Sequence, residues 1–335
     1  MGMHIVAAPD KFRGTATAAQ VAGAIAAAVE ALGHTCDQVP MADGGEGTLD
    51  VLGGANRVTT VTGPGGEPVE AAWRLDRRRA VVEMARASGL ELAGGAEGND
   101  PVAATTTGTG ELIANAVESG ARRVLVAVGG SATTDGGLGA LRALYPLPRL
   151  RGIELVVACD VRTRFVDAAA VFGPQKGATP AQVRLLTRRL ERLAGVYLHD
   201  HGVDVAELVG SGAAGGLAGG LAAAGARLEP GFDVVAEETE LYDRMEHADL
   251  VITGEGFLDA ESFEGKTVGG VAGLASQLAI PVLAVAGDCF DGADRLIDAV
   301  SLVARFGDGR ARADTLACIA EAVTDAVSGR DGPTN

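Results

Sequence analysis

The sequence predicts an α/β protein of two domains, one of them a doubly wound parallel sheet of the Rossmann or flavodoxin type. Short apolar runs alternate with segments of helical periodicity, and many of these runs end in loops rich in glycine. This order of strand, glycine loop, helix and strand is typical of a parallel sheet covered by helices on both faces. Ligands of such sheets bind beyond the carboxyl ends of the strands, so we expect the functional residues in those loops.

The composition fits this fold and narrows the class of function. Of the 335 residues 47% are hydrophobic but only 4% aromatic, so Ala, Val, Leu and Ile must fill the cores. A net charge of −16 disfavours nucleic acid and anionic membranes as partners. The four cysteines lie far apart in the sequence and no amino-terminal signal is visible, which predicts free thiols and a cytoplasmic location.

The two ends of the chain share one pattern. The apolar run at residues 4–8 predicts a buried strand that ends before Pro9 and Asp10. The Ala-rich segment 15–32 predicts a helix that Thr15 or Thr17 caps and Gly33 ends. By the same criteria we expect strands at 36–40, 250–253, 281–286 and 300–303, and helices opening at 42–48 and spanning 267–278 and 312–327.

The middle of the chain predicts a second α/β domain. Residues 58–75 alternate around a Gly-Pro-Gly-Gly turn, which indicates a β-hairpin or meander. Strands are expected at 80–84, 123–128 and 153–158, and helices at 109–119, 136–144 and 181–193. We interpret residues 56–240 as a domain inserted into a discontinuous Rossmann-like domain of residues 1–55 and 241–330, with a frayed tail at 331–335.

Lysine is scarce in this sequence. Lys11, Lys176 and Lys266 are its three lysines among 28 lysines and arginines, and each lies in a short segment that contains glycine, where backbone amides can approach an anion. A compact ammonium on a flexible stem suits phosphate, and a planar guanidinium is not its equivalent. We therefore expect the three lysines to gather in one pocket as anion ligands; the alternative is that they remain by chance on solvated surfaces.

Carboxylates also collect at the predicted strand ends and in the glycine loops. They are Asp10, Asp43, Glu46, Asp135, Asp160, Glu255 and Asp259. Carboxylates near lysines are what Mg²⁺–nucleotide chemistry requires, because Mg²⁺ takes one or two carboxylates together with the phosphates of the substrate. A further aspartate can accept the proton of a hydroxyl group during phosphoryl transfer, and Asp43 and Asp160 are the leading candidates for that role.

Several familiar motifs are incomplete. Residues 210–215 match G-x-G-x-x-G, but a poor strand precedes them, so we favour close packing or a carboxylate held by backbone amides over a dinucleotide site. The Gly265-Lys266-Thr267 segment ends like a P-loop, yet Ala260 stands where that motif needs glycine. His199-x-His201 lacks a third ligand for zinc, and Ser131 is not in a serine hydrolase elbow.

Taken together, the motifs resemble the type I glycerate kinase family over nearly the whole chain. The resemblance is carried by A-P-D-K-F-R-G at 8–14, A-D-G-G-E-G-T at 42–48, and the segments 83–90, 107–112, 129–137, 158–161, 171–178, 212–216, 248–256 and 265–267. It implies phosphorylation of D-glycerate by ATP with Mg²⁺, usually on the 2-hydroxyl, giving 2-phosphoglycerate. It also implies an active site in the cleft between two α/β domains.

On these grounds we assign candidate roles to the residues of the motifs. The candidate catalytic residues are Asp43, Asp160, Lys176 and Lys266, and the candidate metal ligands are Glu46, Glu255 and Asp259. The candidate nucleotide-binding residues are Gly254, Glu255, Gly256, Gly265, Lys266 and Thr267. The candidate substrate-binding residues are Lys11, Arg13, Ser131, Gly212 and Gly215, with Arg13 clamping the carboxylate in a bidentate fork and the amides of Gly129 and Gly130 also available to anionic oxygens.

The sequence departs from the family in ways that bear on the acceptor. The segment between Leu144 and Ile153 is short where the family has a long insertion, and residues 162–167 replace an expected Asn-Pro-Leu stretch. Phe257 stands where a polar or basic residue is common, and Glu261 stands where glutamine is usual and would repel a carboxylate substrate unless paired or turned away. The alternatives are thus a kinase for another short sugar acid and a catalytically inactive metabolite-binding module. A homodimer is compatible with the sequence, although no motif requires one.

Overall fold

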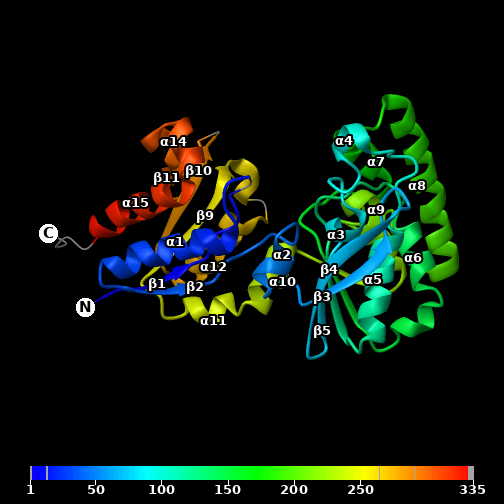
Figure 1. The fold of residues 1–335 in the computed structure, drawn as a ribbon, viewed down its shortest axis with the longest axis horizontal. Helices are drawn as coiled ribbons and strands as arrows, with labels where there is room; N and C mark the ends of the chain where they lie inside the picture. Colours follow the sequence, from blue (N-terminus) through cyan, green and yellow to red (C-terminus); the bar gives the residue numbers. More distant parts are fainter. Residues whose placement is uncertain (1, 13, 264, 291, 331–335) are drawn as a thin grey trace. The chain divides into compact units, whose positions relative to one another are not determined.

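The computed structural model describes residues 2–12, 14–263, 265–290 and 292–330, and its chain forms two compact units (Figure 1). Unit 1 consists of Met1–Asp43 and Phe232–Asn335, and unit 2 is Gly44–Gly231. Both units are α/β, as the sequence predicts. The observed boundaries precede the expected ones near residues 56 and 240 by twelve and nine residues. The first difference arises because Glu83 of unit 2 binds the backbone of the acidic glycine loop, residues 42–48, and of Leu49 directly after it. The expected frayed tail at 331–335 lies outside the described residues.

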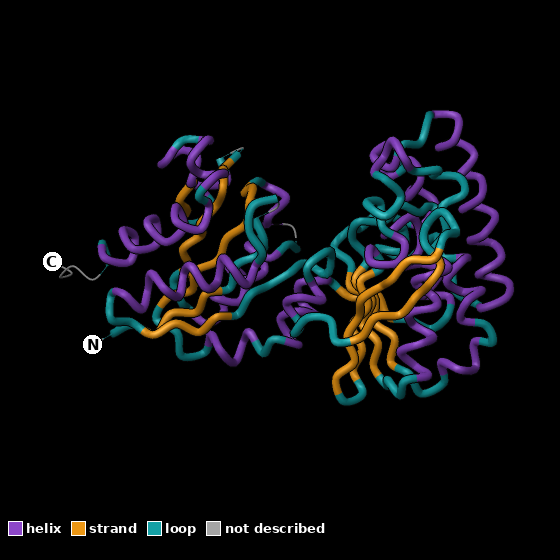
Figure 2. The backbone as a smooth tube through the Cα atoms, in the orientation of Figure 1, coloured by secondary structure: helices purple, strands orange, loops and turns teal. Residues whose placement is uncertain are grey.

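Unit 1 is built on a parallel sheet, in which the described strands follow the order β11-β10-β9-β1-β2 (Figure 2). The strands are β1 (His4–Ala7), β2 (Thr35–Gln38), β9 (Leu250–Leu258), β10 (Val282–Cys289) and β11 (Ala299–Ser301). Ile5 of β1 lies opposite Cys36 on one side and Leu250 on the other, both in parallel register. In order of sequence this is the 2-1-3-4-5 arrangement of flavodoxin-like sheets, which confirms the doubly wound prediction.

Helices cover both faces of this sheet. On one face α1 (Ala18–Ala31) and α15 (Thr315–Ser328) bury Ile25 and Ile319 against Ile252 and Val285. On the other face α12 (Thr267–Leu278) buries Val268 against alanines of β10. The sequence predicted these three helices within a few residues, and Thr17 caps α1 in a capping box with Gln20. The remaining helices are α10 (Gly231–Glu238), α11 (Leu241–Met245), α13 (Leu302–Phe306), α14 (Asp308–Ala313) and the 3₁₀ turns η4 (Ala260–Phe263) and η5 (Ala293–Arg295).

Unit 2 contains a mixed sheet, with the described strands in the order β3-β4-β5-β6-β7-β8. The strands are β3 (Arg57–Thr62), β4 (Pro68–Asp76), β5 (Arg79–Glu83), β6 (Arg123–Ala127), β7 (Glu154–Ala158) and β8 (Arg227–Glu229). β3 and β4 form the antiparallel hairpin predicted over residues 58–75, and β5 adds to it as a further antiparallel strand. The last four strands are parallel. Trp73 is buried in the hairpin and its indole N–H donates to Thr59 Oγ1 at 2.9 Å, which satisfies the one polar atom that this ring brings into the core.

Three helices of unit 2 pack directly on the sheet, and one long helix packs outside them. The core against the sheet comes from α5 (Thr107–Glu118), α6 (Leu138–Leu144) and α9 (Ala213–Ala223). The long α8 (Pro180–His201) packs outside them around Phe165 and Tyr197. The short helices are α2 (Thr48–Val51), α3 (Ala85–Ser88), α4 (Gly95–Gly98), α7 (Ala168–Phe172) and the 3₁₀ turns η1 (Leu147–Leu150), η2 (Phe165–Asp167) and η3 (Pro174–Lys176). In the part of the chain that the structure describes, none of the helices combines the length and the apolarity that crossing a bilayer requires.

The glycines of the G-x-G-x-x-G segment are explained by close packing. The backbone at Ala214, Gly215 and Gly216 is left-handed, so α9 begins in a kink and not in a regular first turn. A Cβ atom on Gly215 would lie 1.9 Å from the Thr133 carbonyl oxygen, and one on Gly212 would lie 2.4 Å from the carbonyl oxygen of Arg164. The segment therefore passes so close to two neighbouring loops that a side chain at either position would have to displace backbone.

Two glycine substitutions in unit 2 test this interpretation. We expect Gly215→Ala to lower the free energy of unfolding by more than about 2 kcal/mol, because it combines a left-handed φ of +68° with a backbone clash. Gly195→Ala is the matched control: Gly195 is exposed in the middle of α8 and a Cβ there meets nothing within 4 Å. That change should raise stability by about 0.5–1 kcal/mol. Urea denaturation of both variants measures the effects, and equal effects would contradict the packing argument.

Candidate active site

The strand order of unit 1 reverses between β1 and β9. In open parallel sheets ligands bind beyond the carboxyl ends of the strands at such a point. The chain leaving β1 passes through Asp10 and Lys11, and the carboxyl half of β9 carries Gly254, Glu255 and Gly256. The Asp10 amide donates to the Gly254 carbonyl oxygen at 2.8 Å. Two segments that the sequence marked separately are thus joined directly at the place where this fold binds ligands.

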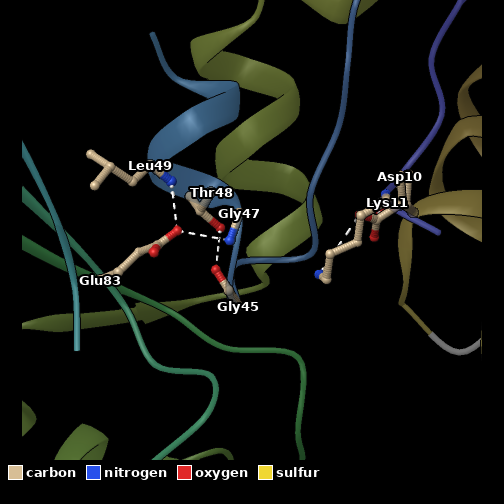
Figure 3. A network of polar contacts seen from close by, with 8 residues as sticks. Asp10, Lys11, Gly45, Gly47, Thr48, Leu49 and Glu83 are labelled. Atoms are coloured by element: carbon tan, nitrogen blue, oxygen red, sulfur yellow. Dashed lines mark hydrogen bonds and ion pairs between the residues drawn. The ribbon is translucent and has the colours of Figure 1, made fainter. Parts of the chain in front are cut away.

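Asp10 follows β1 and is buried, with its carboxylate against the first residue of α12. Its side chain accepts a hydrogen bond from Thr267 Oγ1, the first residue of α12, at 3.1 Å from Oδ2. The Lys11 ammonium lies 3.8 Å from Oδ1, and this pair is drawn in Figure 3. Burial raises the pKa of Asp10 to about 6; Lys11 opposes this shift and the charge of Asp43 adds to it. The sequence noted Asp10 only as one acid among several and gave it no role.

Glu255 faces the same helix. Its register partner on β10 is Ala286, which packs with Val268 of α12, so the carboxylate lies on the α12 side of the sheet. Oε1 of Glu255 is buried and has no hydrogen-bond partner among the described residues. Burial raises the pKa of Glu255 to about 7; Asp10 and Asp259 reinforce this shift, while a hydrogen bond from Ser262 and the charge of Lys266 oppose it. A cation bound between Asp10 and Glu255 would favour the ionised form of both.

The loop between β9 and α12 brings Lys266 to the start of the helix. Gly265 has a φ of +96°, which favours glycine, and Lys266 Nζ lies 3.3 Å from Glu261 Oε2 in an ion pair. Asp259 is engaged within the loop, where Oδ1 accepts from the amide of Ser262 at 3.0 Å. Gly254 also has a packing reason: its Cβ would lie 2.1 Å from the backbone oxygen of the opposing strand β10.

In unit 2 the acidic glycine loop is held by Glu83, a residue to which the sequence assigned no role. Glu83 is 2% exposed, and its Oε1 accepts from the amides of Gly47 and Leu49, each at 2.8 Å (Figure 3). Oε2 accepts from Arg86 Nε at 3.1 Å. The sequence did contain a signal for this role, because Glu83 is a carboxylate at the end of an apolar run that predicts a buried strand. A buried carboxylate needs several hydrogen-bond donors. Glu83 thereby fixes the loop that carries Glu46.

The Gly129-Gly130 pair packs against that loop. A Cβ on Gly129 would lie 2.8 Å from Gly45 Cα, and one on Gly130 would lie 1.9 Å from Glu46 Oε1. The absence of side chains at these two positions therefore allows the acidic loop and the start of the 129–137 segment to meet. Contacts of the two amides with substrate stay a prediction.

Lys176 is buried inside unit 2. Its side chain is 2% exposed, and Nζ donates to Ser131 Oγ at 2.6 Å and to the Thr133 carbonyl oxygen at 2.7 Å. Burial lowers the pKa of Lys176 to about 7, and the negative charge of Asp135 opposes that shift. Asn99 adds to the network by donating to the carbonyl oxygens of Ala132 and Lys176. The described contacts of Lys176 are thus internal, with the segment that contains Ser131.

Asp135 organises the same segment. Its Oδ2 accepts from the amide and hydroxyl of Thr106 at 2.9 and 2.8 Å and from the Gly139 amide at 3.1 Å, and Oδ1 accepts from the Gly137 amide at 3.0 Å. One carboxylate therefore joins the beginnings of α5 and α6. Sequence reasoning named this residue only among the acidic loops, and the glycines around it were the signal for a carboxylate bound by amides.

The candidate site residues that the structure describes are divided between the two units. Lys11, Asp43, Gly254, Glu255, Gly256, Asp259, Gly265, Lys266 and Thr267 belong to unit 1, and Glu46, Ser131, Asp160, Lys176, Gly212 and Gly215 to unit 2. Asp160 Oδ1 accepts from the Gly231 amide at 2.9 Å, and the Gly212 amide donates to the Thr163 carbonyl oxygen. Arg13 lies outside the described residues. Lys11 and Lys266 belong to unit 1, whereas Lys176 belongs to unit 2. The gathering of all three lysines in one pocket therefore stays a prediction.

The described residues contain no group of three or more His, Cys, Asp and Glu side chains arranged to hold a metal by themselves. Mg²⁺ is usually bound through only one or two carboxylates, with phosphates and water completing its shell. The pair of Asp10 and Glu255 fits a site of that kind, because a buried oxygen of Glu255 has no hydrogen-bond partner within the described part of the chain. Of the three predicted metal ligands, Glu255 has this feature, while Asp259 already accepts from Ser262.

The lowered pKa of Lys176 predicts a pH-dependent stability. Between about pH 7 and the usual lysine value of 10.5 the folded chain binds fewer protons at this group than the unfolded chain. The free energy of unfolding of the wild type should therefore rise relative to Lys176→Met as the pH increases from 7 to 10, by at most about 1.4 kcal/mol per pH unit. Urea denaturation at several pH values measures the difference, with the half-exposed Lys266→Met as the control. A difference independent of pH would show that Lys176 is not desolvated in the fold.

Comparisons with known proteins agree with these observations. The model of the "Glycerate kinase family" matches residues 5–145 and 146–326. A glycerate kinase of Halalkalibacterium halodurans is 39% identical over 346 residues, covering 90% of this chain and 91% of that protein. A glycerate 2-kinase of Escherichia coli K12 is 39% identical over 329 residues, covering 86% of each.

A solved structure extends the similarity to the fold. A crystal structure described as a putative glycerate kinase 2 from Salmonella typhimurium LT2 has a TM-score of 0.84 at 34% identity, covering 98% of each chain. The match spans the chain segments of both units, and the resemblance first seen in the motifs is confirmed. The chain belongs to the glycerate kinase family and is an enzyme, a kinase.

Proposed function

We propose that this protein transfers the γ-phosphoryl group of ATP to D-glycerate, at the 2-hydroxyl, with Mg²⁺ as cofactor and 2-phosphoglycerate as product. The observation that carries the proposal is the arrangement of Asp10, Glu255 and Thr267 at the strand-order reversal of unit 1, beside the start of α12. Relatives of this chain are named glycerate kinase and, in Escherichia coli, glycerate 2-kinase. Both the site and the relatives support a kinase that acts on a small organic acid.

The phosphate groups are assigned to the start of α12. This helix is 12 residues long, so its first amides and its dipole favour an anion. Lys266 precedes the helix and is paired with Glu261, whose side chain is 77% exposed. An exposed pair of this kind is worth little, at most about 1 kcal/mol, so Lys266 can exchange Glu261 for a phosphate oxygen. Gly265, Lys266 and Thr267 are therefore our nucleotide-binding segment.

The metal ion is assigned to Asp10 and Glu255. A bound Mg²⁺ would bridge phosphate oxygens and neutralise the charge that develops on them. The two carboxylates would hold the ion at the ends of β1 and β9, and Thr267, which donates to Asp10, would keep one of them oriented. Burial excludes water from the same oxygens, which strengthens each interaction that they make.

The acceptor side rests on the sequence assignments. Asp43 and Asp160 are the candidates for accepting the proton of the hydroxyl group, and Lys11, Arg13 and Ser131 for binding the carboxylate of glycerate. Asp43 is near enough to Asp10 for its charge to raise the pKa of that residue. The Glu261 side chain is 77% exposed, so its carboxylate can turn into solvent, away from a carboxylate substrate, when Lys266 binds phosphate.

A direct assay tests the function. The protein is incubated with ATP, MgCl₂ and a panel of three- and four-carbon hydroxy acids, and ADP is measured. We expect D-glycerate to be preferred, chelation of the metal to stop the reaction, and enolase to consume the product without added mutase. If a four-carbon acid is preferred, that acid and not glycerate is the acceptor. ATP binding without ADP formation from any acceptor would favour a metabolite-binding module.

Lys266→Ala tests the phosphate assignment. We expect turnover to fall by two or more orders of magnitude, since an ammonium that balances developing phosphoryl charge is lost. The melting temperature should change little, because the exposed ion pair contributes little to the fold. Glu261→Gln is the control that removes the same ion pair and keeps the lysine. Near-normal turnover of Lys266→Ala would remove this residue from the active site.

Glu255→Gln tests the metal assignment by stability. The raised pKa means that the ionised carboxylate opposes folding above about pH 7, so the neutral amide should raise the free energy of unfolding at pH 8 by on the order of 1–3 kcal/mol in the absence of metal. The stabilisation that MgCl₂ with nucleotide gives the wild type should be lost in the variant. Denaturation with and without MgCl₂ and nucleotide checks both effects, with the exposed Glu246→Gln as control. Full metal-dependent stabilisation of Glu255→Gln would exclude Glu255 as a ligand.

A further inference from the structure

Two phenylalanines lie uncovered at the carboxyl ends of β9 and β10. Phe257 is 46% exposed and Phe290 is 45% exposed, in a sequence in which aromatic residues make up only 4%. Their ring centroids are 6.0 Å apart and their planes are inclined by 34°. The rings are thus neither stacked nor perpendicular, which are the arrangements that aromatic pairs prefer. Each ring keeps much of its surface available to a further planar group.

The backbone fixes these two rings beside each other. The Phe290 amide donates to the Leu258 carbonyl oxygen at 2.8 Å, which continues the pairing of β9 and β10 beyond the last residue of β10. Asp288, two residues earlier, is the register partner of Phe257. The two rings lie side by side, with 6.0 Å between their centroids. Phe257 is thus placed by β9, and Phe290 by the hydrogen bond of the residue that directly follows β10.

The proposed phosphate and metal site lies on the same strand as Phe257. Phe257 follows Glu255 by two residues on β9, so it lies roughly 7 Å farther along the strand, next to Leu258, which is buried with Val268 of α12. The polar site and the apolar pair are therefore consecutive along one strand. A ligand that reaches both must carry an anionic part and, a short distance away, a planar apolar part.

We propose that Phe257 and Phe290 form a platform on which the nucleobase of the nucleoside triphosphate stacks. The inference rests on the proposed function, because it takes the triphosphate to lie at α12. Aromatic side chains bind bases through their faces, and this contact is tolerant of base identity. The acceptor cannot be the occupant, since a three-carbon hydroxy acid has no planar apolar surface.

The test compares a nucleotide with a ligand that lacks the base. KM for ATP and the inhibition constant of inorganic tripolyphosphate against ATP are measured for Phe257→Ala, Phe290→Ala and the double variant. We expect each single substitution to raise KM for ATP about tenfold and the double substitution to raise it further, in line with the worth of base stacking on aromatic residues. The inhibition constant of tripolyphosphate should stay the same, and Phe257→Trp should retain the wild-type KM for ATP.

Tyr242→Ala is the matched control, because Tyr242 is also 46% exposed and also belongs to unit 1. This variant should leave both constants unchanged. Equal weakening of ATP and tripolyphosphate by the phenylalanine variants would mean that they disturb the phosphate site, and would overturn the platform. Unchanged KM for ATP would overturn it as well.

Two further measurements separate this inference from the proposed function. Equilibrium binding of ATP to the wild type and the double variant reads the platform even where no acceptor is phosphorylated. If the wild type is an active kinase and the double substitution leaves its ATP affinity unchanged, the platform is excluded and the proposed function stands. Sedimentation of the double variant shows whether the pair joins two copies of the chain; dissociation of a dimer with unaltered ATP affinity would replace the nucleobase as the occupant.

Discussion

The burial of two carboxylates where the strand order reverses is the constraint on which unit 1 depends. Asp10 and Glu255 are placed there by adjacent parallel strands, and the bond from the Asp10 amide to Gly254 joins the two segments. Ionised carboxylates in such a place oppose folding unless positive charge or hydrogen bonds compensate them. Thr267, Lys11 and Lys266 supply part of that compensation. A bound cation would supply the rest, so under the proposed function the feature that destabilises the unit would also serve phosphoryl transfer.

Unit 2 uses the buried Glu83 and Lys176 and the half-buried Asp135 for a different purpose. Glu83, Asp135 and Lys176 each bind several backbone or hydroxyl groups, and together they fix the loops that contain Glu46, Ser131 and Thr106. Backbone groups in irregular loops have no ladder partners, so charged side chains satisfy them at the interior. These residues position the loops through internal contacts.

Many glycines of the motifs serve packing between chain segments. Gly129, Gly212, Gly215 and Gly254 each face backbone at a distance that excludes a Cβ atom. A glycine motif read from sequence is therefore ambiguous, because a ligand and a neighbouring backbone impose the same requirement on the residue. Gly265 differs, since its Cβ would meet open space and its left-handed φ alone favours glycine. That backbone turn lies directly before Lys266 and the start of α12.

The sequence by itself determined the α/β class, the two-domain composition, most strands and longer helices, and the family, because periodicity, glycine loops and ordered motifs are local properties of the chain. It also brought Glu255, Lys266 and Thr267 forward as members of one site. Only the tertiary structure decided that Asp10 meets Thr267 and Gly254, that Lys176 is enclosed with Ser131, and that Glu83 holds the acidic loop. These contacts join residues 36 to 257 positions apart, and burial, which sets their pKa values, depends on how distant segments pack.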